Sequence, residues 1–151
     1  MKDRTSLPGL GEIGLANYPP YLMNRIMGRY NATLREDLRK HDLTTAQVRT
    51  LAVLSVSDGL PISALAVYTV IAQSTLSRPL DALEAQGLVR RELGETDSRV
   101  RKVFLTDEGR AEFARAWPWM HASFERMFDG IGEEEYGALV ATLQKMLRNI
   151  R

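Results

Sequence analysis

The sequence predicts a mainly helical protein of the α+β class, in which long terminal helices flank a smaller lobe that ends in a β-hairpin. Apolar residues recur every three or four positions over most of the chain, which is the helical period. Two short helices separated by a turn fall within residues 61–86, and two short strands follow within residues 88–105. This order is typical of a winged helix-turn-helix with a two-stranded β-wing and long N- and C-terminal dimerisation helices.

The composition narrows the class of protein. The chain has 151 residues, of which 44% are hydrophobic, and it has no cysteine. It can therefore bury the core of one domain without disulfides or thiol-bound zinc. The formal net charge is only +1, so a nucleic-acid surface would have to come from local placement of Arg and Lys. With two histidines and no clustered acids, we expect no metal site and no cofactor.

The chain shows no signal peptide and no apolar run near the roughly 20 residues of a membrane span. We therefore expect a cytoplasmic protein without a membrane partner. It also lacks a glycine-rich phosphate loop, a G-x-S-x-G nucleophile elbow and an H-E-x-x-H helix. On these grounds we do not expect an enzyme.

The N-terminal part of the chain divides at a proline pair. Residues 1–18 contain several glycines and a proline without a sustained period, which predicts a flexible arm. Pro19 and Pro20 suit the first turn of a helix. Its apolar positions are Leu22, Met23, Ile26, Met27, Tyr30, Leu34 and Leu38. Because these form two rows, the helix needs more than one partner, and residues 19–43 are predicted to take part in dimerisation.

Residues 44–106 are predicted to form the winged helix-turn-helix lobe. Thr44 and Gln47 have the spacing of a capping box, which begins a helix that ends near Gly59. A short helix then runs from about residue 61 to 68, and a second from about residue 73 to 86. Leu76, Leu80 and Leu83 give the second helix a buried stripe, and Val67 and Ile71 are expected to pack between the two helices.

The C-terminal third continues from the hairpin into two helices. Strands are predicted at residues 88–93 and 100–105, with a charged turn between them. Residues 107–151 are predicted to complete the helical dimerisation region. The apolar face of the last helix consists of Tyr136, Leu139, Val140, Leu143, Met146, Leu147 and Ile150.

Polar side chains at the start of the second short helix are candidates for DNA contact. They are Gln73, Ser74, Thr75, Ser77 and Arg78. In a recognition helix, residues at this end face base edges and phosphates in the major groove, where Gln and Arg can pair bidentately with adenine and guanine. The alternative is a solvated helix start, where Ser and Thr are common.

The hairpin turn supplies a second group of candidates. Arg99, Arg101 and Lys102 place three cations in four positions, where a wing can reach a minor groove or phosphates. Asp97, two residues before Arg99, is expected to orient that arginine through a bidentate pair. The alternative is an exposed ion pair worth about 0–1 kcal/mol.

These residues resemble a known family. Asp97-Ser98-Arg99, followed by Val103, Leu105-Thr106 and Gly109, is similar to the D-x-R-x-x-x-V-x-L-T-x-x-G signature of the MarR winged-helix transcriptional regulators. Residues 73–78 and 83–91 are similar to that family's recognition helix and the strand after it. The resemblance implies a homodimer held by the terminal helices and bound to a pseudo-palindromic operator in double-stranded DNA. It also implies a transcriptional regulator that is often released by a small, frequently aromatic ligand. We expect a repressor in preference to an activator.

Pro79 departs from the family pattern. The family's recognition helix usually has no proline after the Ser-Arg pair, and a proline here removes one helical hydrogen bond. The path of the recognition helix around this residue is therefore open at the level of sequence.

Aromatic and polar side chains on the long helices are candidates for the ligand site that the resemblance implies. They are Tyr21, Arg25, Met27, Tyr30, His41, Trp117 and His121. An arginine with aromatic neighbours suits an aromatic carboxylate or an acyl thioester of an aromatic acid. Met and Trp at helical spacing are also ordinary core residues. An alternative for the whole protein is a helical dimer that does not bind DNA and instead binds a metabolite or a protein partner.

Overall fold

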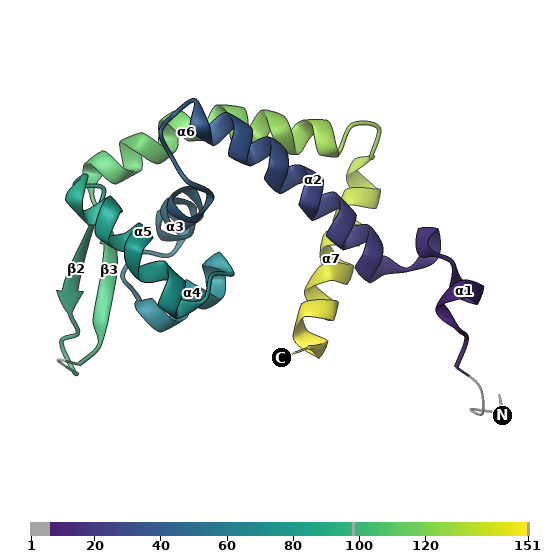
Figure 1. Ribbon diagram of the computed structural model, residues 1–151, viewed down its shortest axis with the longest axis horizontal. Coiled ribbons are helices and arrows are strands. Elements are labelled where there is room, and N and C mark those ends of the chain that lie inside the picture. Colours follow the sequence, from purple (N-terminus) through teal and green to yellow (C-terminus); the bar gives the residue numbers. More distant parts are fainter. Residues whose placement is uncertain (1–6, 98, 151) are drawn as a thin grey trace. The chain divides into compact units, whose positions relative to one another are not determined.

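The computed structural model describes residues 7–97 and 99–150 and confirms the predicted fold class, with many helices and one small antiparallel sheet (Figure 1). The chain divides into two compact units, Met1–Arg115 and Ala116–Arg151. The first six residues of the predicted arm and Ser98 of the signature lie outside the described residues. None of the helices in the described ranges is long and apolar enough to cross a membrane.

The first unit contains most of the helices and the whole sheet. In chain order its helices are α1 (Leu10–Ile13), the 3-10 helix η1 (Leu15–Asn17), α2 (Pro19–Arg39), α3 (Thr45–Val56), α4 (Ile62–Thr69), α5 (Gln73–Ala85) and the start of α6 (Asp107–Met127). The sequence predicted α2 to α6 but not α1 and η1. Each of these two is about one turn long, which is too short to show a period in the sequence.

The predicted capping box at the start of α3 is confirmed. The backbone N–H of Gln47 donates to Oγ1 of Thr44 over 3.1 Å, and the backbone N–H of Thr44 donates to Oε1 of Gln47 over 2.9 Å. The two bonds satisfy donors that a helix start would otherwise leave without partners. α3 ends at Val56, close to the predicted end near Gly59, and Gly59 has a left-handed conformation with φ +67°.

The sheet has the order β1-β3-β2 and consists of β1 (Leu60–Pro61), β2 (Val89–Leu93) and β3 (Arg101–Leu105). The predicted hairpin is β2 and β3, with Val89 opposite Leu105 and Leu93 opposite Arg101. The third strand, β1, was not predicted, because two residues are too few to show an alternation. It connects the chain before α4 to the wing.

The core of the first unit lies between the helix-turn-helix and the sheet. The stripe Leu76, Leu80 and Leu83 is fully buried, as predicted. The rest of this core is formed by Leu51, Leu54, Leu65, Ala66, Leu88, Val89, Val103 and Leu105. Ile71 packs against it, but Val67 is 74% exposed, so the prediction that Val67 packs between the helices was wrong. Its side chain on α4 lies in solvent.

The turn between α4 and α5 contains a strained residue. Val70 has φ +56° and lies in the left-handed region, which is unfavourable for a β-branched side chain. Its side chain is 82% exposed and gains little from burial. The backbone N–H of Ile71, which donates to the carbonyl of Ala66 over 3.1 Å, helps hold the turn closed.

Gly109, the last residue of the signature, lies where the chain passes very close to itself. A Cβ atom placed there would lie 2.0 Å from the backbone oxygen of Leu88 and 2.7 Å from Cδ1 of Leu105. Glycine at this position therefore lets α6 begin against the end of the sheet.

The second unit consists of the rest of α6 and of α7 (Glu133–Asn149). Aromatic rings pack the end of α6 against the start of α7: the ring centroid of Tyr136 lies 5.0 Å from that of Phe128 and 6.1 Å from that of Phe124. No residue of α7 is buried. Its apolar positions Tyr136, Leu139, Leu143, Leu147 and Ile150 are all exposed.

Candidate nucleic-acid interface

Helix α5 has the amphipathic character expected of a recognition helix. Its leucine stripe faces the core, and the predicted contact residues Gln73, Ser74, Thr75, Ser77 and Arg78 are all exposed. Pro79 lies inside the helix, which remains continuous from Gln73 to Ala85. The polar side chains at its N-terminal end are thus free to meet a partner.

The turn of the wing is organised by backbone bonds. The N–H of Gly94 donates to the carbonyl of Val100 over 2.6 Å. Oδ1 of Asp97 accepts the backbone N–H of Arg99 over 2.9 Å. Asp97 therefore shapes the turn through the main chain, and the bidentate side-chain pair with Arg99 that the sequence suggested does not form. The guanidinium of Arg99 is exposed and makes no ion pair within the described residues.

Recognition helix and wing meet at a shared hollow of about 320 Å³. Gln73 from the start of α5 and the wing residues Arg99 and Arg101 line it, together with Ser63 from the first turn of α4. Two guanidinium groups, a hydroxyl and an amide are the donors that hold a phosphate. The remaining lining residues, Pro61, Ile62 and Val100, are uncharged.

Lys102 and Ser63 need separate comment at this site. Lys102, predicted as a DNA contact, is half-buried and lies opposite Glu92 in the sheet, whereas its neighbour Arg101 is exposed. Successive strand residues point to opposite faces, so Lys102 and Arg101 do not share one. Ser63 was not predicted. The only signal for it in the sequence is the preceding Pro61, which marks a helix start.

Arg91 of β2 is a second residue that the sequence analysis did not assign a role. Its guanidinium lies between Asp81 and Glu84 of α5. Hydrogen bonding to Arg91 holds the pKa of the Glu84 carboxyl below its ordinary value, and the two acids raise the pKa of Arg91. The carboxyl of Glu84 and the guanidinium of Arg91 are therefore both charged at neutral pH.

The predicted ligand residues fall into separate groups. In the first unit, Nη1 of Arg25 donates to the hydroxyl of Tyr21 over 2.8 Å, and both line a groove of about 480 Å³ along α2. Met27 and His41 are exposed and Tyr30 is half-buried. None of these three lines that groove.

The other two predicted ligand residues belong to the second unit. The rings of Trp117 and His121 lie 5.5 Å apart on α6, and Nδ1 of His121 lies 3.5 Å from Oε1 of Glu125. The described residues contain no group of three or more His, Asp or Glu side chains placed to hold a metal ion.

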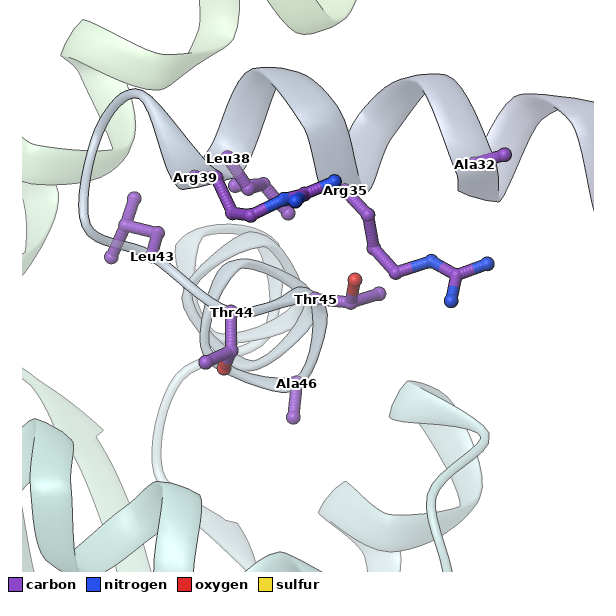
Figure 2. A pocket seen from close by; sticks show the side chains of 8 residues that line it. All are labelled: Ala32, Arg35, Leu38, Arg39, Leu43, Thr44, Thr45 and Ala46. Atoms are coloured by element: carbon purple, nitrogen blue, oxygen red, sulfur yellow. The ribbon is translucent and has the colours of Figure 1, made fainter.

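A larger cavity of about 650 Å³ lies between α2 and the start of α3 (Figure 2). Arg35 and Arg39 of α2 contribute two exposed guanidinium groups to its lining. Leu38 and Leu43 form an apolar part of the cavity wall. The hydroxyl oxygen of Thr45 points toward α2 and is buried without a hydrogen-bond partner. Ala32, Thr44 and Ala46 complete the lining. None of these residues was predicted from the sequence to bind a ligand.

The fold and the surface that recognition helix and wing share define a winged helix-turn-helix DNA-binding protein. A sequence model of the MarR family matches residues 41–100. A MarR-family transcriptional regulator from Silicibacter pomeroyi, known from its crystal structure, is 56% identical with a TM-score of 0.90, over 95% of this chain and 97% of that one. The chain belongs to the MarR family of transcriptional regulators.

Two further relatives are informative. The HTH-type transcriptional repressor IacR of Pseudomonas putida is 26% identical over 95% of this chain and 86% of its own length. CouR from Rhodococcus jostii RHA1 bound to p-coumaroyl-CoA is 25% identical with a TM-score of 0.77, over 88% of this chain and 94% of that one. The repressor CouR bound to a 23-mer DNA duplex is 28% identical with a TM-score of 0.73, over 94% and 99% of the two chains.

Proposed function

We propose that this protein is a homodimeric repressor that binds a pseudo-palindromic operator and is released by a small aromatic acid or its thioester. The observation that carries the DNA-binding part is the hollow where Gln73 of the recognition helix meets Arg99 and Arg101 of the wing. In a dimer, two recognition helices would enter successive major grooves about one helical turn apart. The likeness to CouR, which has been seen on DNA, supports this mode of binding.

The residues proposed to contact DNA have different roles. Gln73, Ser74, Thr75, Ser77 and Arg78 would meet base edges and phosphates in the major groove. Arg99 and Arg101 would contact the minor groove or its phosphates, with Asp97 holding the turn that presents them. Lys102, being half-buried, would contribute mainly charge.

A salt series tests DNA binding directly. The affinity for a duplex containing the region upstream of the protein's own coding sequence should fall linearly in log salt, because each phosphate contact releases counterions. Arg99→Ala should reduce both the affinity and the slope, whereas Arg115→Ala removes an exposed cation on α6 and serves as the control. Binding that is absent at low salt, or flat with salt, would favour a helical dimer that does not act on DNA.

The exposed apolar side chains of the terminal helices support the homodimer. Leu143 and Leu147 of α7 are 40% and 62% exposed, and Leu22 and Ile26 of α2 are 39% and 49% exposed. An apolar helix stripe of this kind normally packs against a partner, and in a two-fold dimer the same stripe serves both subunits.

Sedimentation measurements test the assembly. Leu143→Asp together with Leu147→Asp should shift the protein toward the monomer, because the charges would be buried in the interface. Gln144→Asp adds a charge next to that stripe and should leave the dimer intact. A dimer that persists in the double variant would contradict dimerisation through α7.

The cavities of the first unit support an anionic effector. Arg35 and Arg39 beside the apolar Leu38 and Leu43 suit a molecule with an acid or phosphate group and an apolar body. The groove at Tyr21 and Arg25 offers similar chemistry on a smaller scale. Met27, Tyr30, His41, Trp117 and His121 remain candidates for contacts with the aromatic part. The ligand that accompanies CouR, p-coumaroyl-CoA, is of this chemical type.

Thermal-shift measurements with aromatic carboxylates and their coenzyme A thioesters test the effector proposal. A ligand that binds only the folded protein raises the melting temperature by mass action. Arg35→Ala with Arg39→Ala should abolish the shift if the larger cavity is the site, and Arg25→Ala should abolish it if the groove is. Release requires the effector to bind the DNA-free conformation more tightly than the DNA-bound one. A ligand that shifts melting without weakening operator binding would contradict the regulatory role.

A further inference from the structure

The guanidinium of Arg91 connects the wing to the recognition helix. Its Nε lies 2.8 Å from Oε2 of Glu84, and its Nη2 lies 2.7 Å from Oδ1 of Asp81 and 3.3 Å from Oε1 of Glu84. The side chain of Arg91 is 18% exposed, whereas those of the two acids are 60% and 42% exposed. The arginine is thus more buried than the two acids, and most of its N–H donors already form hydrogen bonds with them.

The two acids lie in the half of α5 that follows Pro79. Because Pro79 has no N–H, the carbonyl of Thr75 lacks the donor that an unbroken helix would give it. The two halves of the helix are therefore joined by one fewer backbone bond. Asp81 and Glu84, one turn apart, fasten the second half to β2.

Arg91 connects the two elements that are proposed to contact DNA, the recognition helix α5 and the wing. Strand β2 is part of the wing and pairs along its whole length with β3. That strand begins at Arg101, two residues after Arg99. Helix α5 begins with Gln73, which lines the same hollow as those two arginines. A rigid link between α5 and β2 therefore fixes the spacing of the groups around the hollow.

We propose that Arg91 is a positioning residue for operator binding, which holds the recognition helix and the wing as one rigid unit without touching DNA itself. This inference rests on the proposed DNA-binding function. If the two acids acted only through their charge, removing both carboxylates from a DNA-binding helix should strengthen binding, because the phosphates would be repelled less. Positioning predicts that their removal weakens binding, because Arg91 then loses its hold on α5.

The test compares operator affinity over a salt series for wild-type protein, Arg91→Ala, Arg91→Lys, and the double variant Asp81→Ala with Glu84→Ala. Both Arg91→Ala and the double variant should bind about tenfold more weakly, a loss on the scale of one specific contact. Their salt slopes should equal that of the wild type. Lysine should restore binding only in part, because a single ammonium does not span two carboxylates as a guanidinium does. Arg90→Ala removes the neighbouring cation, which stacks on Phe104, and should have a smaller effect.

Each outcome decides the inference. A salt slope that falls by about one in Arg91→Ala would identify Arg91 as a phosphate contact and overturn the positioning role. Wild-type or tighter binding by the double variant would also overturn it. Circular dichroism and melting curves show whether each variant is folded, and alanine at both acid positions favours the helix. If wild-type protein itself shows no salt-dependent binding, the proposed function fails, which is a separate result.

Discussion

Asp58 and Arg110 join the end of α3 to the first turns of α6: Oδ2 of Asp58 lies 2.9 Å from Nη2 of Arg110. The other carboxylate oxygen accepts the backbone N–H of Leu105 over 2.8 Å and that of Gly59 over 3.1 Å. One side chain thereby links a helix end, the last residue of β3 and the start of the following helix. The backbone hydrogen bond from Leu105 and the ion pair with Arg110 should contribute differently to the free energy of unfolding.

Asp58→Ala should lower the free energy of unfolding by about 1–3 kcal/mol, since it leaves the part-buried N–H of Leu105 without its acceptor. Arg110→Ala should lower it by only about 0–1 kcal/mol, because that pair is half exposed. Urea denaturation of the two variants measures both values. Equal losses would mean that the ion pair, and not the backbone bond, gives Asp58 its effect.

Pro79→Ala should retain the fold and bind the operator as well as or better than the wild type. Alanine restores the backbone bond within α5, and helix propensity favours it over proline by up to about 3 kcal/mol. A DNA titration together with thermal denaturation checks both effects. A folded variant that has lost operator binding would show that the proline shapes the recognition surface.

Arg99→Ala should weaken operator binding by about 1–3 kcal/mol, the scale of a specific arginine contact. Its guanidinium is exposed at the hollow that also contains Gln73. Fluorescence anisotropy with a labelled duplex measures the loss. Unchanged affinity would remove Arg99 from the interface.

Gly109→Ala should be strongly destabilising, because its Cβ would lie 2.0 Å from the oxygen of Leu88 and the backbone would have to move. Gly137→Ala is the matched control, since it also lies within a helix but has open space around it. That change should stabilise the protein by about 0.5–1 kcal/mol. Melting temperatures that fall in both variants would contradict this distinction.

The bond between Glu84 and Arg91 should make stability depend on pH in the acid range. Because hydrogen bonding to Arg91 lowers the pKa of Glu84 from 4.5, its contribution is fully present above pH 4.5 and is lost as the pH falls through the lower, folded value. The difference in free energy of unfolding between wild type and Glu84→Gln should therefore shrink at low pH. A difference that grows on acidification would contradict the assigned pKa direction.

The sequence predicted the elements whose signals are local. The capping box at Thr44 and Gln47 and the buried stripe beginning at Leu76 each depend on residues a few positions apart, and both were confirmed. The signature around Arg99 identified the family because its spacing reflects a hairpin and the helix after it. These features are visible wherever chain neighbours determine the structure.

What the sequence did not predict depends on contacts between separate elements. Arg91 meets Glu84 and Asp81 at separations of 7 and 10 residues, which requires α5 and β2 to be packed together first. Val67 was placed inside by its apolar character, but its position on α4 faces water. The cavity around Thr45 lies between two helices, and no spacing in the sequence encodes how those helices pack.

The left-handed Val70 has a consequence for how the helix-turn-helix holds together. A β-branched residue in this conformation is unfavourable by about 1–3 kcal/mol. Because the side chain is 82% exposed, its burial offsets almost none of that cost. The turn is therefore imposed by the packing of the helices on either side. As an isolated peptide, residues 62–85 should lose the left-handed turn at Val70. In the whole protein, Val70→Gly should remove the backbone strain and leave the side chains of α5 in place.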